Sequence, residues 1–291
     1  MTKFTAPASE FLVPYDGTFR VMDAATAPAD ADEKRDEKRL DRATERLDVL
    51  QQALYANDRH AVLLVFQGMD AAGKDSTIRA VMRGINPAGC QVFAFKRPSA
   101  AELDHDFLWR ISRVMPERGR IGIFNRSHYE EVLVVRVHPH ILESQQLPNT
   151  IDRETIWQER FESIRDLEKH LARNGTVILK FWLNVSKDEQ KRRFLARLDD
   201  KKRHWKFNPA DLDERRKWSD YMSAYEDALN ATSRPWAPWY ALPADDKPYM
   251  RACIAELVVE ALQGIGLSYP QPTAADRALF DQSRKELTVA D

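Results

Sequence analysis

The stretch VLLVFQGMDAAGKDSTI, residues 62–78, decides the fold. It joins an apolar run to Gly-x-x-x-x-Gly-Lys, the pattern of a loop that binds phosphate through its backbone N–H groups. Gly68 and Gly73 permit the backbone angles of such a loop, and a helix that begins near Gly73 would add the positive end of its dipole. Lys74 would neutralise phosphate oxygens. The alternative is a glycine-rich turn with a solvated lysine, but the order of strand, loop and helix favours phosphate.

Two acidic residues depart from the usual pattern of this loop. Asp75 stands where a Ser or Thr ordinarily follows the lysine, and Asp70 lies inside the loop. A carboxylate beside phosphate would be repelled unless a cation lay between them, and Mg²⁺ prefers one or two carboxylates together with phosphates and water. Asp70 is therefore a candidate metal ligand, with capping of the following helix as its alternative role. Asp75 lies in the first helical turn, where the dipole alone favours an acid.

Apolar runs alternate with helical patterns on the C-terminal side of this loop. Runs typical of strands that are buried on both faces of a parallel sheet occupy residues 61–67, 91–95, 120–125, 176–185 and 239–242. Helical segments are expected at residues 74–84, 103–115, 127–137, 152–173, 187–198, 211–230 and 246–264. This alternation predicts one three-layer α/β/α domain over residues 61–267, with a central parallel sheet and right-handed crossovers.

The flanks of this domain have different patterns. Residues 1–30 are rich in Ala, Pro and Asp and suggest an irregular arm, while residues 31–57 have the spacing of an amphipathic helix. The apolar stripe of that helix is expected to pack on the main domain or on a second subunit; it consists of Leu40, Leu47, Leu50 and Leu54. Residues 1–60 therefore form an arm and a helix, and residues 268–291 a peripheral tail.

Composition limits the class of protein. The 291 residues include 44 Lys and Arg against 45 Asp and Glu, so the net charge is −1 and any site for a polyanion must come from clustered cations. Cys90 and Cys253 lie far apart without metal-ligand spacing, which suits a reducing compartment. We find neither a secretion signal nor an apolar run of the ~20 residues that cross a bilayer. A soluble cytoplasmic protein is expected.

The third apolar run leads into IFNRSHYEEVLVVRVHP, residues 123–139. Ligands of open α/β sheets bind at the carboxyl ends of the strands. We therefore expect the same crevice as that of the glycine-rich loop to be faced by Asn125, Arg126, Ser127 and His128. Arg126 suits a phosphoryl group because its guanidinium is permanently charged and donates as a planar fork. His128 has two interpretations, as a phosphate ligand or as a packed or solvated histidine.

Ser127 and Glu130 also fit a structural pattern. The spacing Ser-x-x-Glu is that of a capping box, in which the two side chains satisfy backbone N–H groups at the start of a helix. Glu130 therefore has a structural interpretation that needs no substrate.

A basic segment follows the fourth run. Residues 187–206 contain nine Lys or Arg and four acids, and Ser186 with Glu189 predicts another capping box at the start of a helix. The segment could be a solvated face, but its place beside the crevice favours a closing lid over about residues 187–217. Arg193 and Arg197, four residues apart, would share one face of that helix.

Four motifs together resemble polyphosphate kinase family 2, and most of all its class III: GMDAAGKD, FNRSHYEEVLVVRVHP, KRRFLARLDDKKRHWKF and ATSRPWAPWYALPADDK. They occur in the family's order over about residues 60–267. The resemblance implies a P-loop kinase-like fold with a helical lid, and transfer of phosphoryl groups from inorganic polyphosphate to AMP and ADP. It implies Mg²⁺ as cofactor, with Mn²⁺ as an alternative, guanine nucleotides as further acceptors, and a homo-oligomer, dimer or tetramer. Neither nucleic acid nor a membrane is an expected partner.

The resemblance also assigns roles to residues. The family residues matched by Lys74 and Asp70 bind phosphate and Mg²⁺, and the one matched by Arg126 contacts the transferred phosphate. Asn125 fits the class III pattern, and the position of Glu130 is acidic in the class that accepts AMP as well as ADP. The expected catalytic residues are Asp70, Lys74, Arg126 and Arg193, with Asp70 as the metal ligand. The expected substrate contacts are Gly68, Ala71, Ala72, Gly73, Asp75, Asn125, His128, Glu130, Arg136 and Arg197.

A long polyphosphate also needs a basic track. Cations are available around the second and third strands, although their spacing does not prove a single path: Lys96, Arg97, Arg110, Arg113, Arg118 and Arg120. Some tryptophans could stack on a nucleobase, with packing as their alternative role: Trp205, Trp218, Trp236 and Trp239.

Two other functions remain open at this point. An ATP-dependent nucleoside monophosphate kinase would share loop, lid and fold, but Asp75 stands where its metal-binding hydroxyl is expected. A non-catalytic binder of polyanions or nucleic acid would explain the basic segment but gives no reason for Asp70 to face an anion. A phosphohistidine route through His128, His138 or His140 has little support.

Overall fold

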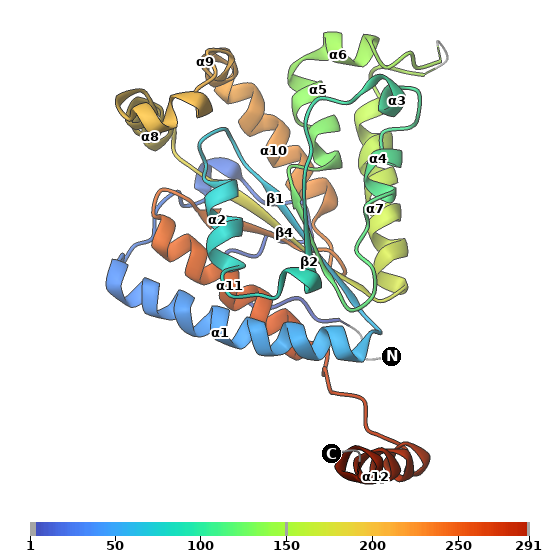
Figure 1. The fold of residues 1–291 in the computed structure, drawn as a ribbon. Helices are drawn as coiled ribbons and strands as arrows, with labels where there is room; N and C mark the ends of the chain where they lie inside the picture. Colours follow the sequence, from blue (N-terminus) through green and yellow to red (C-terminus); the bar gives the residue numbers. More distant parts are fainter. Residues whose placement is uncertain (1–3, 149–150, 290–291) are drawn as a thin grey trace.

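The computed structural model describes residues 4–148 and 151–289. Its core is a parallel sheet in the order β2-β3-β1-β4-β5, with helices on both faces (Figure 1). The strands are β1 (Ala61–Gln67), β2 (Cys90–Ala94), β3 (Ile121–Asn125), β4 (Thr176–Asn184) and β5 (Trp239–Pro243). Each lies where an apolar run predicted it, and the three-layer α/β/α architecture is confirmed.

The helices form the two outer layers. α1, α2 and α11 lie on one face of the sheet, and α5, α7 and α10 lie on the other (Figure 1). The α-helices are α1 (Glu33–Asn57), α2 (Lys74–Val81), α3 (Ala100–Leu103), α4 (Trp109–Ser112), α5 (Val134–Val137), α6 (Pro139–Glu143), α7 (Ile156–Arg173), α8 (Lys187–Asp199), α9 (Ala210–Arg216), α10 (Trp218–Thr232), α11 (Lys247–Gly264) and α12 (Ala274–Val289). The 3-10 helices are η1 (Val21–Asp23), η2 (Pro87–Gly89), η3 (His128–Glu131) and η4 (Lys201–Lys206).

The central strand β1 explains why its sequence is a continuous apolar run. It pairs with β3 on one side and β4 on the other, and all seven of its residues are buried. Val65 lies level with Phe124 of β3 and Lys180 of β4. Because all five strands are parallel, their carboxyl ends meet at one edge, where the glycine-rich loop leaves β1. Lys180 is the charged exception in the buried part of β4.

The N-terminal arm and α1 both belong to the packed body. The arm pairs with the edge strand β5, because Val13 N donates to Trp239 O at 2.9 Å and Ala241 N donates to Phe11 O at 2.8 Å. That edge pairing is a feature the prediction of an irregular arm did not include. The apolar stripe of α1 packs along α11, which is the first of the two alternatives that the sequence left open.

Three predicted helices are interrupted. Within the predicted helix 103–115, only Leu103 (the last residue of α3) and Trp109–Ser112 (α4) are helical. Asp106 Oδ1 accepts the N–H of Leu108 at 2.9 Å and so competes with helical pairing between them. Residues 127–137 divide into η3 and α5, and residues 211–230 divide into α9 and α10 at Lys217. Periodicity found the apolar faces, but local side-chain hydrogen bonds and turns decided where helices end.

The predicted tail contains α12, which lies away from the rest of the body in Figure 1. Over the described ranges 4–148 and 151–289, no helix combines the length and the apolar character needed to cross a bilayer.

Candidate active site

The glycine-rich loop at residues 68–73 has the backbone of an anion cradle. Gly68 has a φ of +152° and Gly73 one of +109°, and Ala71 also has a positive φ, of +62°. A Cβ added at Gly68 would lie 2.9 Å from Leu183 O in β4, so that a side chain does not fit there. The loop is therefore pressed against the sheet with glycine where the angles require it, and α2 begins directly after it.

Lys74 folds back over its own loop. Its Nζ donates to Gly68 O at 2.6 Å and to Met69 O at 3.3 Å. Burial lowers the pKa of Lys74, as does the neighbouring Arg126, while nearby carboxylates including that of Asp70 oppose the shift. The ammonium group thus lies at the centre of the cradle, where phosphate oxygens could replace the two carbonyls as its partners.

Arg126 and Asp70 face one another at the mouth of this cradle. Arg126 Nη2 donates to Asp70 Oδ1 at 2.7 Å, and the Arg126 side chain is 42% exposed. The backbone of Arg126 is left-handed, with φ at +61°, and its N–H donates to Phe66 O at 3.0 Å. Burial alone would lower the pKa of Arg126, but Glu130 and Asp70 outweigh it and raise that pKa. The guanidinium is held charged and stays open to the crevice.

The capping box predicted at Ser127 and Glu130 is not formed. Ser127 Oγ accepts the N–H of Tyr129 at 3.2 Å, and η3 has only four residues. The Glu130 carboxylate turns toward the site, where the Gln67 side-chain amide, oriented to satisfy its neighbours, donates to Oε1 at 2.9 Å. Burial raises the pKa of Glu130 and Arg126 opposes that shift. Sequence spacing alone could not distinguish a cap from an inward-facing acid.

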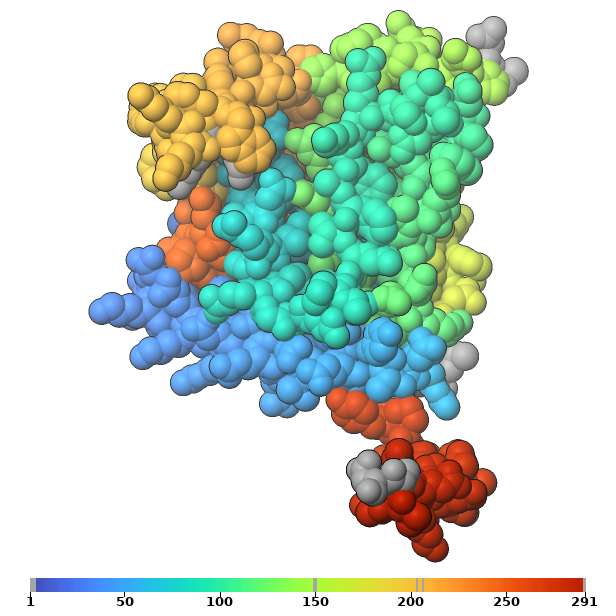
Figure 2. All heavy atoms as spheres, in the orientation of Figure 1, coloured from blue at the N-terminus to red at the C-terminus, as the bar shows by residue number. Residues whose placement is uncertain are grey.

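Around this cradle lies a crevice of about 750 Å³. Figure 2 shows the yellow and orange atoms of α8 to α9 beside the teal surface that borders this crevice. Within the described part of the chain nine cations line it: Lys74, Arg79, Lys96, Arg126, Arg192, Arg193, Arg197, Lys247 and Arg251. They outnumber the acids Asp70, Asp75 and Asp211 three to one, so this chain of net charge −1 has a local site for a polyanion.

Arg193 has a different environment from the one predicted for a phosphate ligand. Its Nη1 donates to Ala71 O and Ala72 O, both at 2.9 Å, and its Nη2 donates to Ala244 O at 2.6 Å. Its Nε donates to Glu189 Oε1 at 2.7 Å, and the side chain is 6% exposed. Arg193 therefore clamps the glycine-rich loop to the segment after β5. Contact between Arg193 and the transferred phosphate stays a prediction.

The predicted lid corresponds to α8, η4 and α9, and its base is tied to the loop. Ser186 Oγ accepts the N–H of Glu189 at 3.1 Å, but Ser186 N donates to Asp245 Oδ1 at 2.7 Å, so only half of the predicted capping box forms. Gln190 Nε2 donates to Asp70 O at 2.9 Å. Any movement of α8 would therefore be transmitted to the loop.

Two crevice residues that the sequence did not reveal have shifted pKa values. Burial lowers the pKa of Lys247 to about 8, with Arg193 and Arg251 adding to the effect. Burial and Asp70 together raise the pKa of Asp211 to about 6. Lys247 begins the helix after the fifth strand, and the rule that ligands bind at strand carboxyl ends could have identified it. Asp211, in α9, gave no such signal; it faces Arg197, whose Nη1 lies 3.7 Å from its Oδ2.

Other predicted contacts divide between the crevice and the rest of the protein. Asn125 lines the crevice and its Nδ2 donates to Asp75 Oδ1. His128 does not reach the crevice: its ring is 2% exposed, and burial together with Lys180 lowers its pKa to about 3. The substrate contact expected of His128 is corrected to a packed histidine. Arg136 also lies elsewhere, since its Nη2 donates to Asp227 Oδ2 of α10 at 2.5 Å.

The expected basic track is only partly at the crevice. Lys96 lines it, whereas Arg110 donates to Lys96 O at 3.0 Å and pairs with Glu102. Arg118 and Arg120 precede β3 and so lie at the amino ends of the strands. Of the tryptophans, Trp205 lines the crevice and Trp239 is buried in the core.

The oxygen ligands at the crevice fit Mg²⁺. Among residues 4–148 and 151–289 no group of three or more His, Cys, Asp or Glu is arranged to hold a metal by itself. Asp70, Asp75 and Asp211 each supply one carboxylate to the lining of the crevice. A hard cation that keeps water and phosphate oxygens as most of its ligands needs no more than this from the protein.

Comparison with known proteins agrees with this geometry. The family model described as Polyphosphate kinase 2 (PPK2) matches residues 30–266. The chain belongs to the polyphosphate kinase 2 family. The match includes α1, which the predicted domain boundary at residue 61 left outside.

Individual relatives support the same assignment. A protein of Rhodopseudomonas palustris named ADP-polyphosphate phosphotransferase is 58% identical over 244 residues, 84% of each chain. A Meiothermus ruber protein named AMP/ADP-polyphosphate phosphotransferase is 46% identical over 81% of this chain and 85% of its own. The crystal structure of polyphosphate kinase 2 from Arthrobacter aurescens TC1 has a TM-score of 0.85 and 37% identity, covering 96% of this chain and 98% of that chain.

Proposed function

We propose that this polyphosphate kinase 2 transfers a phosphoryl group from inorganic polyphosphate to AMP and ADP, forming ADP and ATP. The observation that carries the proposal is the placement of Lys74, Arg126 and Asp70 around one glycine-rich cradle in a crevice of nine cations. Phosphoryl transfer asks little covalent chemistry of a protein and depends on positioning and charge neutralisation. This arrangement supplies both.

The glycine-rich loop and three charged side chains would bind and position the reacting phosphates. Lys74 Nζ would exchange its two loop carbonyls for phosphate oxygens, and the backbone N–H groups of the loop would hold the same phosphate. Arg126, held at the mouth by Asp70, would turn its fork to the phosphoryl group in transfer. Glu130, behind Arg126, would organise the acceptor end and distinguish AMP from ADP.

Asp70 is the proposed ligand for Mg²⁺, with Mn²⁺ as the alternative metal. When bound there, the cation would neutralise phosphate charge and help to align the donor with the acceptor. Asp70 then has two partners in turn, Arg126 and the metal, which accounts for a carboxylate inside a phosphate loop.

The side of the crevice formed by α2, α8 and α11 is the proposed path of the polyphosphate. Arg79 extends from α2, Arg192 from α8, and Lys247 with Arg251 from α11, so that four cations from three helices line it. A chain of closely spaced negative charges would meet them in succession. The nucleotide would then lie against the other side of the crevice, at Lys96, Phe95 and Trp205. Its base could stack on the ring of Phe95 or on that of Trp205. Guanine acceptors, a homo-oligomer and a cytoplasmic location stay predictions.

The test is formation of ATP by the purified protein from ADP, polyphosphate and Mg²⁺, followed by luciferase. AMP and GDP are supplied in parallel reactions, with their products separated by chromatography. Reactions without polyphosphate, and with ATP as donor to AMP, are the controls. ATP that appears only with polyphosphate supports the proposal. Transfer to AMP from ATP alone would favour a nucleoside monophosphate kinase, and no transfer from either donor would leave a polyanion-binding protein.

A further inference from the structure

A closed network of buried polar groups lies beneath the active site. Lys180, in the middle of β4, is fully buried, and its Nζ donates to Glu168 Oε2 at 2.6 Å, Tyr129 Oη at 2.8 Å and Thr232 O at 2.9 Å. Tyr129 Oη donates in turn to Glu168 Oε1 at 2.8 Å. All three donors of the ammonium group and both oxygens of Glu168 are therefore used. These four residues are called the Lys180 network.

Aromatic rings enclose the ammonium group. Nζ of Lys180 lies 5.3 Å from the centre of the Tyr129 ring and 5.2 Å from that of Trp239. Trp239 Nε1 donates to Thr232 Oγ1 at 2.9 Å, which fixes the ring against the network. The rings give cation–π contacts and exclude water from the charges.

Stability alone does not explain this arrangement. Two charges lose their hydration when they are buried, and their mutual attraction often does no more than compensate. Apolar side chains of similar volume can replace such a pair without loss of stability. An apolar residue at the position of Lys180 would also have matched its neighbours in β4. The Lys180 network is therefore better explained by a role in fixing one conformation of the residues around it.

The network ends at the turn that carries the active-site residues. Tyr129 lies between Arg126 and Glu130, and the four-residue η3 is too short to be stable without tertiary contacts. Arg126 also adopts a left-handed backbone, which the surrounding structure must enforce. The hydroxyl of Tyr129 fixes this turn to α7 through Glu168 and to β4 through Lys180.

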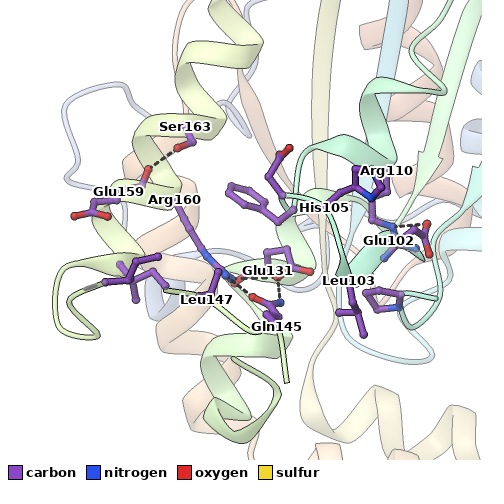
Figure 3. A pocket seen from close by; sticks show the side chains of 15 residues that line it. Glu102, Leu103, His105, Arg110, Glu131, Gln145, Leu147, Glu159, Arg160 and Ser163 are labelled. Carbon is purple, nitrogen blue, oxygen red and sulfur yellow. Dashed lines mark hydrogen bonds and ion pairs between the residues drawn. The ribbon is translucent and has the colours of Figure 1, made fainter. Parts of the chain in front are cut away.

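The same helix holds the turn at a second point. Arg160, two helical turns before Glu168 in α7, donates from Nη1 to Glu131 O at 3.0 Å and to Glu131 Oε2 at 3.1 Å. Figure 3 shows Arg160, Glu131 and Gln145 together on one wall of a cavity of about 210 Å³. Two buried charged residues of α7 thus hold consecutive parts of one turn.

We propose that the Lys180 network is a positioning device that sets the location of Arg126 and Glu130, and thereby the rate and the choice between AMP and ADP, without touching the substrate. The inference rests on the proposed roles of those two residues. It requires that an apolar replacement keep the fold but loosen the turn. Catalytic efficiency with AMP and ADP would then change unequally, since Glu130 would no longer stand at a fixed distance from the acceptor.

The experiment compares the double variant Lys180→Met/Glu168→Leu with the single variant Tyr129→Phe, which removes one hydroxyl and leaves the ion pair intact. For the double variant we expect a melting temperature near that of the wild type and kcat with ADP reduced about tenfold. The ratio of kcat/KM for AMP to that for ADP should shift at least threefold, with KM for polyphosphate unchanged. Tyr129→Phe should change kcat and the ratio in the same direction by less.

Hydrogen exchange of the peptide that contains residues 126–132 supplies a readout that needs no activity. Exchange should be faster in both variants and unchanged in the peptide that contains α2. The matched control is Arg39→Met, which removes the ion pairs of Arg39 with the buried Asp36 in α1 and with Glu256 of α11. It should lower the melting temperature but leave the acceptor ratio and the 126–132 exchange unchanged.

The outcomes separate the inference from the proposed function. If the wild type forms no ATP, the proposed function is overturned. Hydrogen exchange of residues 126–132 then still tests whether the Lys180 network holds the turn after β3. Wild-type exchange at residues 126–132 in Tyr129→Phe overturns the inference even if the double variant fails to fold. Wild-type kcat and acceptor ratio in a folded double variant overturn it as well.

Discussion

The turn after β3 and the base of the lid each place one arginine beside the same phosphate loop, but the two arginines have different environments. Arg126 is 42% exposed, and its guanidinium donates to the Asp70 carboxylate at the mouth of the crevice. Arg193 is 6% exposed, and backbone carbonyls of Ala71, Ala72 and Ala244 occupy its fork. The first can exchange its partner for phosphate, whereas the second already holds the loop together.

This difference teaches that nearness to a site and availability to a substrate are separate properties. A guanidinium has five N–H donors, and a buried arginine that releases them leaves carbonyls unsatisfied. Arg126 should therefore act mainly on the rate, and Arg193 mainly on the stability of the loop. The predictions below test that division, from the largest expected effect to the smallest.

Replacing Arg126 with alanine should lower kcat by about 100- to 1000-fold, the usual effect of removing a group placed against developing charge. The melting temperature should stay within a few degrees, because the lost contact is a half-exposed one. Lys74→Ala should reduce turnover by more than about tenfold for the same reason. Luciferase assays and thermal denaturation of each variant measure both effects. Near-normal turnover in either folded variant would remove that residue from the mechanism.

Replacing Arg193 with methionine should lower the free energy of unfolding by about 3 kcal/mol, because Glu189 and the loop carbonyls lose a buried partner. Urea denaturation measures it. Arg192→Met is the matched control: Arg192 is the adjacent residue, pairs with the same Glu189 and is 70% exposed, so we expect a change below about 1 kcal/mol. Equal stability of the two variants would show that the clamp does not matter.

Replacing Asp70 with asparagine should raise the Mg²⁺ concentration at half-maximal rate about tenfold, which corresponds to the loss of about 1.4 kcal/mol of attraction for the cation. A neutral amide is a poorer ligand for a hard cation than a carboxylate. The measurement is a Mg²⁺ titration at saturating substrates. An unchanged midpoint together with an unchanged maximal rate would argue against a metal at Asp70.

Replacing Glu130 with glutamine should reduce kcat/KM for AMP about fivefold more than that for ADP, a difference of about 1 kcal/mol. The amide keeps the shape of the side chain but removes the charge beside Arg126. The melting temperature should change by only a few degrees, since no capping box depends on Glu130. Equal losses with the two acceptors would refute a role in acceptor choice.

Raising the pH from 7 to 9 should weaken polyphosphate binding through Lys247. A lysine is charged below its pKa, and burial has lowered this pKa to about 8, so the cation is lost within that range. Lysines with pKa values near 10.4 stay charged. KM for polyphosphate should rise about threefold in the wild type, a cost of less than about 1 kcal/mol. In Lys247→Gln, KM for polyphosphate should be higher than in the wild type at pH 7 and should change little up to pH 9. A parallel rise in both proteins would exclude Lys247 as the cause.

Much of the fold could be predicted from the sequence because β1, β3, β4 and β5 are buried on both faces, although the edge strand β2 is only partly buried. Each strand is then a continuous apolar run, and turn residues mark its ends. Residues 103–115 were mispredicted as one continuous helix because the Asp106 side chain accepts a local backbone N–H, an effect that periodicity does not detect. The sequence left open whether the apolar stripe of α1 packs on the main domain or on a second subunit, because packing between segments that lie far apart in the chain leaves no local signal. The stripe packs along α11.

The site was predictable where a motif fixes the backbone and less so where tertiary packing decides. Lys74 and Asp70 lie at the cradle because the glycines of one short loop place them there. His128 lies two residues after Arg126 yet enters the core, because the turn directs successive side chains to different sides. Lys247 joins the crevice from a helix about 170 residues further along the chain, and only the assembled sheet brings it there.

The division between the two arginines is tested most directly by chemical rescue of ATP formation with guanidinium ion, at concentrations that do not unfold the protein. Arg126→Ala leaves an opening at the crevice that the ion can enter, so ATP formation by this variant should rise severalfold. Arg193→Ala leaves a buried gap that the ion cannot reach without displacing the loop, and its rate should not respond. Rescue of Arg193→Ala without rescue of Arg126→Ala would contradict the account.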